Sequence, residues 1–216
     1  MKDIERIEKI NWWHSIELPD YGVTKGRVGS DHCSAHVISD RFGMPEDLLG
    51  KTVLDIGTFD GLFAFEAEKR GAKVTAIDCY QSSAENGNGF MLAKGLLESD
   101  VEFYHFSLKD FVEYGVTNYF DICLYYGVLY HVENPLRELS YLSQVTKEFA
   151  LIESAIIQNE HSGRNIWEFN NGFDNDKTNF WYCSFKGLES VLKYVGFREV
   201  QLVWTDAIRM TVKAIK

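Results

Sequence analysis

VLDIGTFDGLFAFEAEKRGAKVTAID, residues 53–78, is the stretch that decides the fold. Two short apolar runs, 51–57 and 73–78, enclose a segment of helical character that stops at Gly71. Short apolar runs that stop at a glycine or polar residue are typical of strands buried on both faces, and a glycine commonly ends a helix. The stretch therefore predicts a strand, a helix over 62–72 and a second strand parallel to the first.

The alternation of strands and helices continues to the end of the chain. Because only a few residues separate the last two strand-like runs, these must pair as an antiparallel hairpin. The pattern predicts a Rossmann-like, doubly wound α/β fold with a mostly parallel seven-stranded sheet, a C-terminal antiparallel strand and an N-terminal helical arm. We expect one domain, 1–216, with its arm over 1–45. The other expected strands are 101–106, a strand within 120–131, 148–155, 198–204 and 208–215, and the other expected helices are 3–14, 86–98, 135–146 and 185–195.

The turn after the first strand has the composition of a ligand site. Asp55 ends the first strand and Asp78 ends the second, at the edge where open α/β sheets bind cofactors and where a carboxylate can reach ribose hydroxyls. Gly57 and Gly61 allow the backbone to approach a ligand closely. The central glycine of a dinucleotide-binding turn is absent, and Asp60 would repel a pyrophosphate. We therefore predict S-adenosylmethionine, which carries an ammonium group and no phosphate.

Other interpretations of this turn remain open. Gly57 and Gly61 would also serve a tight turn that binds nothing, and a site for NAD is the residual alternative. A protein that holds the cofactor without transferring its methyl group would have the same residues, because glycines and Asp78 indicate binding and not turnover.

Charge and composition restrict the partners. The chain has 22 Lys and Arg against 32 Asp and Glu, and its net charge of −10 disfavours RNA or DNA. The four cysteines are scattered without a C-x-x-C pair, and no metal site is predicted. No apolar stretch approaches the ~18 residues that span a bilayer, and the N-terminus is charged, so we expect a cytoplasmic protein without membrane contact. A homodimer is compatible with this size, although no segment identifies an interface.

Four motifs carry a resemblance to a known family. They are WHSIEL (13–18), GKTVLDIGTFDGLFAFEAEKRGA (50–72), FDICLYYGVLYHVENPL (120–136) and GLESVLKYVGF (187–197). The chain resembles the class I S-adenosylmethionine-dependent methyltransferases and, more narrowly, the group typified by the tRNA wobble-uridine carboxymethyltransferase. Those enzymes use a carboxylated cofactor that needs cationic partners. The arm has no lysine near Trp13, so transfer of an ordinary methyl group is expected.

The resemblance also implies roles for individual residues. Tyr126 and Tyr130, after the fourth strand, would face the sulfonium and the incoming acceptor. Trp13 and His14, from the arm, would close over the site. The predicted cofactor-binding residues are Asp55, Gly57, Thr58, Asp60, Gly61, Asp78, Cys79, Tyr126 and, beside the adenine, Ser107 and Leu108.

Methyl transfer to a hydroxyl needs a base as well as alignment. His131 is the first candidate because an imidazole accepts a proton near neutral pH, although it would equally serve to cap the loop and orient Tyr130. His14 is the second candidate and His161 a weaker third. The predicted catalytic residues are His131, His14 and Tyr130, and Glu153 is either a substrate ligand or a structural carboxylate.

Residues 158–182 form an insertion rich in asparagine and aromatic side chains. Such a composition is typical of a binding loop for a sugar or a planar base, and a solvated loop is the alternative. The leading hypothesis is therefore an enzyme that methylates oxygen of a small-molecule or saccharide-like acceptor. The rival is modification of a tRNA wobble base, for which a basic surface would have to converge from Lys25, Arg27, Arg41, Lys51 and Arg164.

Overall fold

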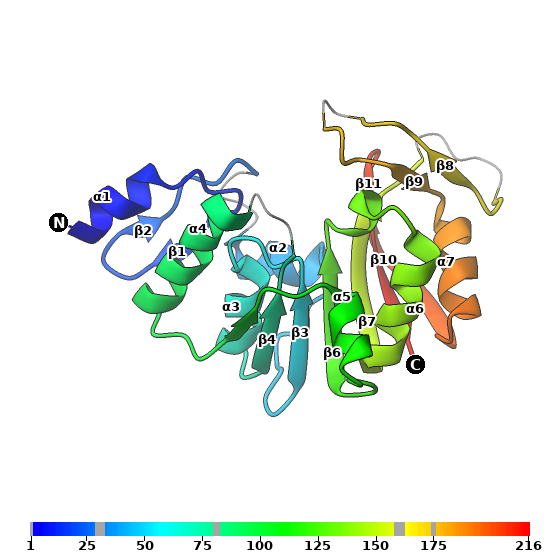
Figure 1. Cartoon of the computed structure of the whole chain (residues 1–216), viewed down its shortest axis with the longest axis horizontal. Coiled ribbons are helices and arrows are strands. Elements are labelled where there is room, and N and C mark those ends of the chain that lie inside the picture. Colours follow the sequence, from blue (N-terminus) through cyan, green and yellow to red (C-terminus); the bar gives the residue numbers. More distant parts are fainter. Residues whose placement is uncertain (1, 29–32, 80–82, 158–162, 174–175) are drawn as a thin grey trace. The chain divides into compact units, whose positions relative to one another are not determined.

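The computed structural model of the chain describes residues 2–28, 33–79, 83–157, 163–173 and 176–216, and for 83–88 it describes the backbone alone. The chain forms two compact units (Figure 1). Unit 1 consists of Met1–Ser39 and Met44–Ser107, and unit 2 consists of Asp40–Gly43 and Leu108–Lys216.

Unit 1 contains three parallel strands. β3 (Thr52–Ile56) pairs with β4 (Lys73–Ile77), which pairs with β5 (Glu102–Tyr104). α3 (Leu62–Lys69) connects β3 to β4, and α4 (Ser83–Leu96) connects β4 to β5. The N-terminal region adds α1 (Lys2–Lys9), the antiparallel pair β1 (Glu17–Leu18) and β2 (Gly22–Val23), and α2 (Ala35–Asp40).

Local sequence explains the start and end of α3. Gly61 precedes the helix with a φ of 93°, and a Cβ at this position would overlap the rings of Phe65 and Phe90. Only glycine meets both conditions. Gly71, one residue beyond the helix C-cap, has a φ of 95°. The prediction that Gly71 ends this helix is confirmed.

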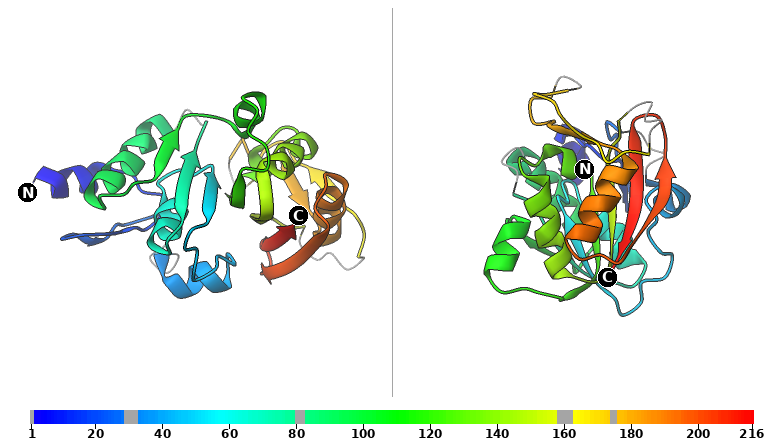
Figure 2. Two further views of the ribbon diagram at one scale, coloured as in Figure 1. Left: turned by 90° about the horizontal axis from the view of Figure 1, so that it is seen from below. Right: turned by 90° about the vertical axis from the view of Figure 1, so that its right-hand side faces the viewer.

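Unit 2 contributes four strands in the order β10-β11-β7-β6. β6 (Phe120–Tyr126) is parallel to β7 (Thr146–Ala155), whereas β11 (Arg209–Ile215) is antiparallel to β7 and to β10 (Glu199–Thr205). The helices α5 (Leu108–Glu113), α6 (Pro135–Val145) and α7 (Phe185–Tyr194) lie side by side on one face of these strands (Figure 2). The side chain of Asn134 caps α6 by accepting from the amide of Arg137 over 3.1 Å, with Pro135 in the first turn.

Two short elements complete unit 2. η2 (Leu129–His131) is a single 3-10 turn after β6, and β8 (Trp167–Phe169) pairs antiparallel with β9 (Trp181–Cys183). The second pair lies inside the insertion predicted at 158–182, of which residues 158–162, with His161, and 174–175 lie outside the described residues.

The structure confirms the seven predicted strands and the C-terminal hairpin, and it corrects three shorter segments. The helix expected over 3–14 ends at Lys9, where the indole of Trp12 folds back to donate to the carbonyl of Ile7 over 3.0 Å. The short strand β2 was not expected, and the expected insertion loop includes β8 and β9. β2, β8 and β9 lie outside the regular alternation of strands and helices, and their two or three residues show too little periodicity to be recognised on their own.

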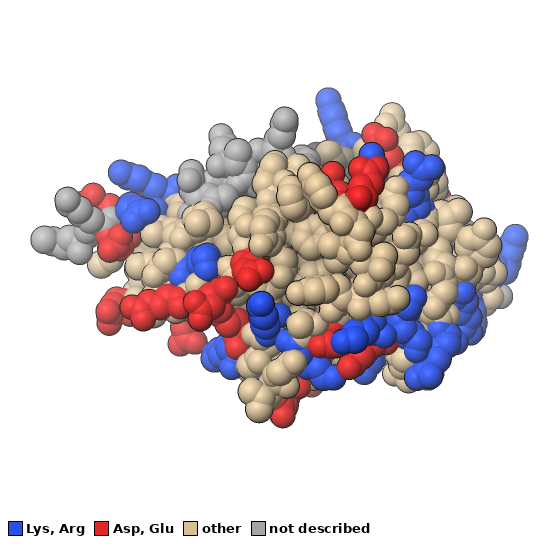
Figure 3. Space-filling model, turned by 60° about the horizontal axis from the view of Figure 1, so that its bottom comes forward, with Lys and Arg blue, Asp and Glu red and all other residues tan. Residues whose placement is uncertain are grey.

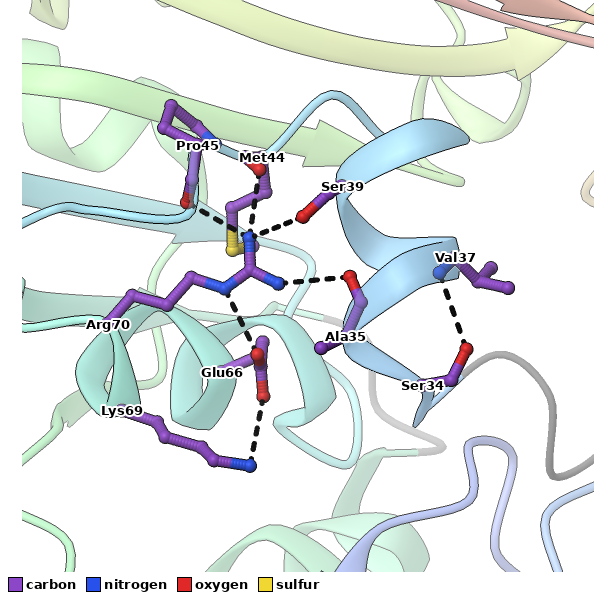
Figure 4. A network of polar contacts seen from close by, with 9 residues as sticks. All are labelled: Ser34, Ala35, Val37, Ser39, Met44, Pro45, Glu66, Lys69 and Arg70. Atoms are coloured by element: carbon purple, nitrogen blue, oxygen red, sulfur yellow. Dashed lines mark hydrogen bonds and ion pairs between the residues drawn. The ribbon is translucent and has the colours of Figure 1, made fainter.

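A buried arginine joins α3 to the segment before β3 (Figure 4). The side chain of Arg70 is 6% exposed and donates to the carboxylate of Glu66 over 3.0 Å. It also donates to Ser39 Oγ over 3.2 Å and to backbone carbonyls of Ala35, Met44 and Pro45 over 3.3, 2.8 and 2.9 Å. One guanidinium therefore satisfies five acceptors from α2, the 44–45 segment and α3.

Replacing Arg70 with methionine should lower the free energy of unfolding by about 3 kcal/mol, because it leaves Glu66 and the carbonyls without their donor. Urea denaturation measures this change. The matched control is Lys69→Met, since Lys69 is 69% exposed and lies 3.9 Å from the same carboxylate. Equal stability losses in the two variants would show that the buried network contributes nothing of its own.

Candidate functional site

The turn after β3 is fixed to the end of β4. The amides of Gly57 and Thr58 both donate to the carbonyl of Ile77, over 2.9 and 3.2 Å. The amide of Phe59 donates to Oδ2 of Asp78 over 3.0 Å. The predicted ligand turn is thus held in one conformation by backbone contacts and by the carboxylate predicted to bind ribose.

Three carboxyl groups at this turn are buried. Asp55, Asp60 and Asp78 are 2%, 0% and 5% exposed. Burial raises the pKa of Asp55 to about 7, with the Thr58 hydroxyl opposing the shift and the charge of Asp78 adding to it. Burial also raises the pKa of Asp60 to about 6, against the amides that it accepts from. A cation beside these groups would stabilise their ionised forms, whereas a phosphate would meet like charge.

Asp60 also anchors the N-terminal arm. Its Oδ2 accepts from the amides of Trp13 and His14 over 2.6 and 3.0 Å. Its Oδ1 is buried and has no hydrogen-bond partner among the described residues. The sequence indicated a ligand role for Asp60 but not this contact with the arm, because the residues involved are 46 and 47 positions apart.

The arm brings aromatic rings to the turn. The ring of Trp13 meets that of Phe59 edge-on at 6.1 Å between centroids, and the ring of His14 meets Phe63 at 5.6 Å. Trp13 is 41% exposed, whereas Trp12 is 3% exposed and belongs to the core. The structure therefore places Trp13 and His14 beside the predicted cofactor turn, as a cover for it requires.

The remaining predicted cofactor residues are more dispersed. Cys79 is exposed and follows Asp78, and Ser107 is half-buried at the end of unit 1. Leu108 begins α5 in unit 2 and is 1% exposed, so its side chain is a core residue. The hydroxyl of Tyr126 donates to the carbonyl of Phe42 over 2.9 Å, which commits it to the backbone of the 40–43 segment.

A second group of polar residues lies in unit 2. Glu153, near the end of β7, is 5% exposed and forms ion pairs with Arg209 at 3.7 Å and Arg41 at 4.0 Å. Arg209 also lies over the ring of Tyr130, with its guanidinium carbon 4.4 Å from the ring centroid. Burial raises the pKa of Glu153, while Arg209 and Arg41 oppose that shift. Sequence reasoning singled out Glu153 and Tyr130, but it missed the pairing of Glu153 with Arg41, which precedes β7 by more than a hundred residues.

His131, the first candidate base, ends η2 in the same unit. Its Nδ1 lies 3.1 Å from the carbonyl oxygen of Thr178 and 3.0 Å from the Thr178 hydroxyl. Burial lowers the pKa of His131, which favours the neutral imidazole near pH 7. A neutral, oriented imidazole is what a general base requires.

A pocket of about 290 Å³ opens between α6, α7 and the β8–β9 pair. Trp167 and Trp181 contribute rings from β8 and β9, at 74° and 6.3 Å between centroids. The other lining residues are Glu133, Asn134, Pro135, Leu136 and Val191. The predicted binding insertion thus contributes two aromatic side chains to the lining of this pocket.

The described residues were also compared with what a metal site or a membrane span requires. These residues contain no group of three or more His, Cys, Asp or Glu side chains that could hold a metal ion. Within the same ranges, no helix has the length and apolar character needed to cross a membrane.

Comparison with known proteins matches residues 35–202 to a family model described as a methyltransferase domain. Ubiquinone biosynthesis O-methyltransferase of Rickettsia canadensis (strain McKiel) is 31% identical over 144 residues, covering 62% of this chain and 53% of that protein. The protein of the same description from Rickettsia felis (strain ATCC VR-1525 / URRWXCal2) is 27% identical over 139 residues, covering 62% and 51%. The chain therefore spans about half the length of these curated relatives.

Solved structures share the fold. The N-terminal domain of EvdMO1 with SAH bound has a TM-score of 0.72 and 16% identity, covering 99% of this chain and 95% of that chain. Magnesium protoporphyrin IX methyltransferase (ChlM) from Synechocystis PCC 6803 with bound SAM has a TM-score of 0.56 and 15% identity, covering 78% and 71%. The likeness confirms the predicted Rossmann-like, mostly parallel sheet with its antiparallel C-terminal strand.

The comparisons support the resemblance to class I S-adenosylmethionine-dependent methyltransferases and not the narrower resemblance to the tRNA wobble-uridine group. The two curated relatives are described as ubiquinone biosynthesis enzymes, and neither description supports the tRNA wobble-uridine group. The matched family model includes the β3 turn and Glu153 and leaves out Trp13, His14 and Arg209. Because that model covers more than half of the chain, the protein belongs to the methyltransferase-domain family.

Proposed function

We propose that the protein uses S-adenosylmethionine to methylate an oxygen atom of a small-molecule or saccharide-like acceptor. The observation that carries the proposal is the group of buried carboxyls Asp55, Asp60 and Asp78 around the turn after β3. Two of them have pKa values of about 7 and 6, so a cationic ligand gains from their ionisation. A dinucleotide would instead place its pyrophosphate against negative charge.

The residues of unit 1 fit this cofactor. Asp78 accepts hydrogen bonds from the ribose hydroxyls, and Gly57 admits the methionine part close to the backbone. Gly61 shapes the turn, since the rings of Phe65 and Phe90 fill the position of its missing Cβ. Asp60 is 0% exposed, and a Cβ at Gly89 would lie 3.2 Å from its Oδ1, so this carboxylate acts on the ammonium group through its charge and not by direct contact. When bound, the cofactor supplies an electrophilic methyl group on a sulfonium. The SAH and SAM in two neighbours of the same fold support this assignment.

Oxygen is the proposed attacking atom. The curated relatives are described as O-methyltransferases, and an acceptor hydroxyl needs a base of the kind that neutral His131 provides. The saccharide-like acceptor has separate support from the EvdMO1 domain, which has also been solved in the presence of SAH and D-fucose. In this chain, the pocket with Trp167 and Trp181 offers aromatic faces for a ring, and Glu133 offers an acceptor for hydroxyl groups.

The Trp181→Leu variant tests whether the pocket holds the acceptor. We expect KM for the acceptor to rise about tenfold with kcat little changed. The substitution removes roughly 1–2 kcal/mol of binding free energy, and it removes this energy equally from the bound acceptor and from the transition state. Steady-state kinetics measure both constants. The matched control is Tyr194→Leu, since Tyr194 is 80% exposed on α7 and does not line the pocket. An unchanged KM in Trp181→Leu would remove the pocket from the acceptor site.

A tRNA acceptor is the alternative that the narrower resemblance suggests. A phosphate backbone requires clustered Lys and Arg, whereas this chain has a net charge of −10. On the face drawn in Figure 3, Lys and Arg side chains gather at the lower right with only a few Asp and Glu side chains among them. The net charge of the chain, and not the arrangement of charge on that face, therefore favours a small acceptor.

Methyl transfer from tritiated S-adenosylmethionine separates the two acceptor classes. The purified protein is added to an extract of the source organism from which its gene has been deleted. We expect label in the soluble small-molecule fraction. Label in a ribonuclease-sensitive precipitate would replace the small acceptor with RNA, and binding of S-adenosylhomocysteine without any label would indicate a protein that holds the cofactor only.

A further inference from the structure

We propose that Thr178 and Asp176 are positioning residues that hold His131 in the tautomer with its proton on Nδ1, so that Nε2 is the nitrogen that accepts the proton of the acceptor hydroxyl. This inference rests on the proposed function, in which His131 is the base. Both residues belong to the insertion, whose sequence gives no sign of a link to His131.

The tautomer follows from the partners of Nδ1. The carbonyl oxygen of Thr178 lies 3.1 Å from Nδ1, and because a carbonyl can only accept, Nδ1 must carry the hydrogen. The Thr178 hydroxyl, 3.0 Å from Nδ1, donates its own hydrogen to Oδ1 of Asp176 over 2.7 Å. Its oxygen therefore presents a lone pair to His131. The Nδ1 hydrogen faces two acceptors of one residue.

The loop that carries these acceptors is fixed to the backbone beside His131. The amide of Phe180 donates to the carbonyl of Tyr130 over 2.7 Å. The amide of Thr178 donates to Oδ1 of Asp176 over 2.8 Å, and the side-chain amide of Asn179 donates to the carbonyl of Phe173 over 2.9 Å. Thr178 thus has little freedom to leave the imidazole.

The groups around His131 shift its pKa in opposite directions. Burial lowers the pKa of His131, and the positive charge of Arg209 lowers it further, whereas the Thr178 carbonyl and the negative charge of Asp176 raise it. Burial tends to raise the pKa of Asp176, but hydrogen bonds from Thr178 and the charge on His131 outweigh this and lower it. Asp176 therefore remains ionised at neutral pH, where it stabilises the imidazolium that forms during turnover.

The proton balance of the step is simple. As the bond between the acceptor oxygen and the methyl carbon forms, the bond from that carbon to sulfur breaks and its electron pair stays on sulfur. The hydroxyl proton moves to Nε2 of His131, which becomes an imidazolium with Nδ1–H still bonded to Thr178. Release of that proton to water restores the base.

Long-range proton–nitrogen NMR tests the tautomer without any substrate. In the wild-type protein, we expect the ring nitrogens of His131 to show the chemical shifts of an imidazole that is protonated on Nδ1. Thr178→Val loses the hydroxyl and keeps the carbonyl, so the Nδ1-protonated tautomer should persist in this variant. We expect kcat to fall about tenfold, because the imidazole loses the hydroxyl that links it to Asp176. Thr178→Ser should restore kcat, and Lys177→Ala is the neighbouring control that should leave it unchanged.

The pH profile tests the role of Asp176. In Asp176→Asn, the acid limb of kcat/KM should move to lower pH, because the charge that raises the pKa of His131 is gone. NMR shifts of an Nε2-protonated imidazole in the wild-type protein would overturn the positioning role. An unchanged kcat in Thr178→Val would overturn the link between that role and catalysis. The transfer of methyl groups to small molecules is tested separately by the label experiment.

Discussion

Replacing His131 with glutamine should lower kcat about 100-fold and leave the dissociation constant of S-adenosylhomocysteine unchanged. Burial lowers the pKa of the imidazole. Its Nδ1 lies 3.0 Å from the hydroxyl and 3.1 Å from the carbonyl oxygen of Thr178. One ring nitrogen thus remains to take a proton. Glutamine keeps the approximate size and polarity of the side chain but cannot serve as a base. Initial rates and calorimetric titration separate the loss of turnover from a loss of binding.

The pH profile and a second histidine provide the controls for this prediction. An imidazole accepts a proton only when the pH is above its pKa, and burial lowers the pKa of His131 from the ordinary 6.5. Wild-type kcat should therefore decline when the pH falls below this lowered pKa. His131→Gln should lack this decline. His14→Gln should weaken cofactor binding and change kcat little, because the ring of His14 packs beside Phe63 at the cofactor turn. If His14→Gln loses the decline while His131→Gln keeps it, His14 is the base.

The fold could be predicted because its signals are local. A buried strand, a turn with Gly61 and a helix that stops before Gly71 each follow from adjacent residues. Asn134 and Pro135 mark the start of α6 in the same way. The pairs β1–β2 and β8–β9 escaped prediction because each strand depends on its partner more than on its own two or three residues.

The candidate site was predictable only as far as single positions carry chemistry. Asp55, Asp60 and Asp78 could be chosen from the turn, but burial sets their pKa values and depends on the whole of unit 1. The pairing of Glu153 with Arg41 and that of His131 with Thr178 join distant parts of the chain. No local pattern specifies such pairs.

The affinity for S-adenosylhomocysteine should fall on the order of 10³-fold between pH 8 and pH 5. The pKa values of about 7 for Asp55 and about 6 for Asp60 mean that both groups take up protons over this range in the free protein. A ligand with an ammonium group favours the ionised forms, so protons must be released on binding and affinity falls as pH falls. If binding requires both ionised groups, Asp55 contributes roughly 100-fold and Asp60 roughly tenfold. Calorimetry in buffers of different ionisation enthalpy measures the affinity and the protons released.

A neutral ligand and a variant decide whether these carboxyls respond to the charge of the ligand. 5′-Deoxy-5′-methylthioadenosine has the adenine and ribose without the ammonium group, so its affinity should depend on pH far less. Asp60→Asn should flatten the dependence for S-adenosylhomocysteine, while its amide oxygen can still accept from Trp13 and His14. In the free protein, the raised pKa values make the folded state bind more protons than the unfolded chain between about pH 4 and 7, so the free energy of unfolding should decline as pH rises through that window. The ligand should remove this decline. Equal pH dependence for both ligands would mean that Asp55 and Asp60 stabilise the turn itself and not the positive charge of the cofactor.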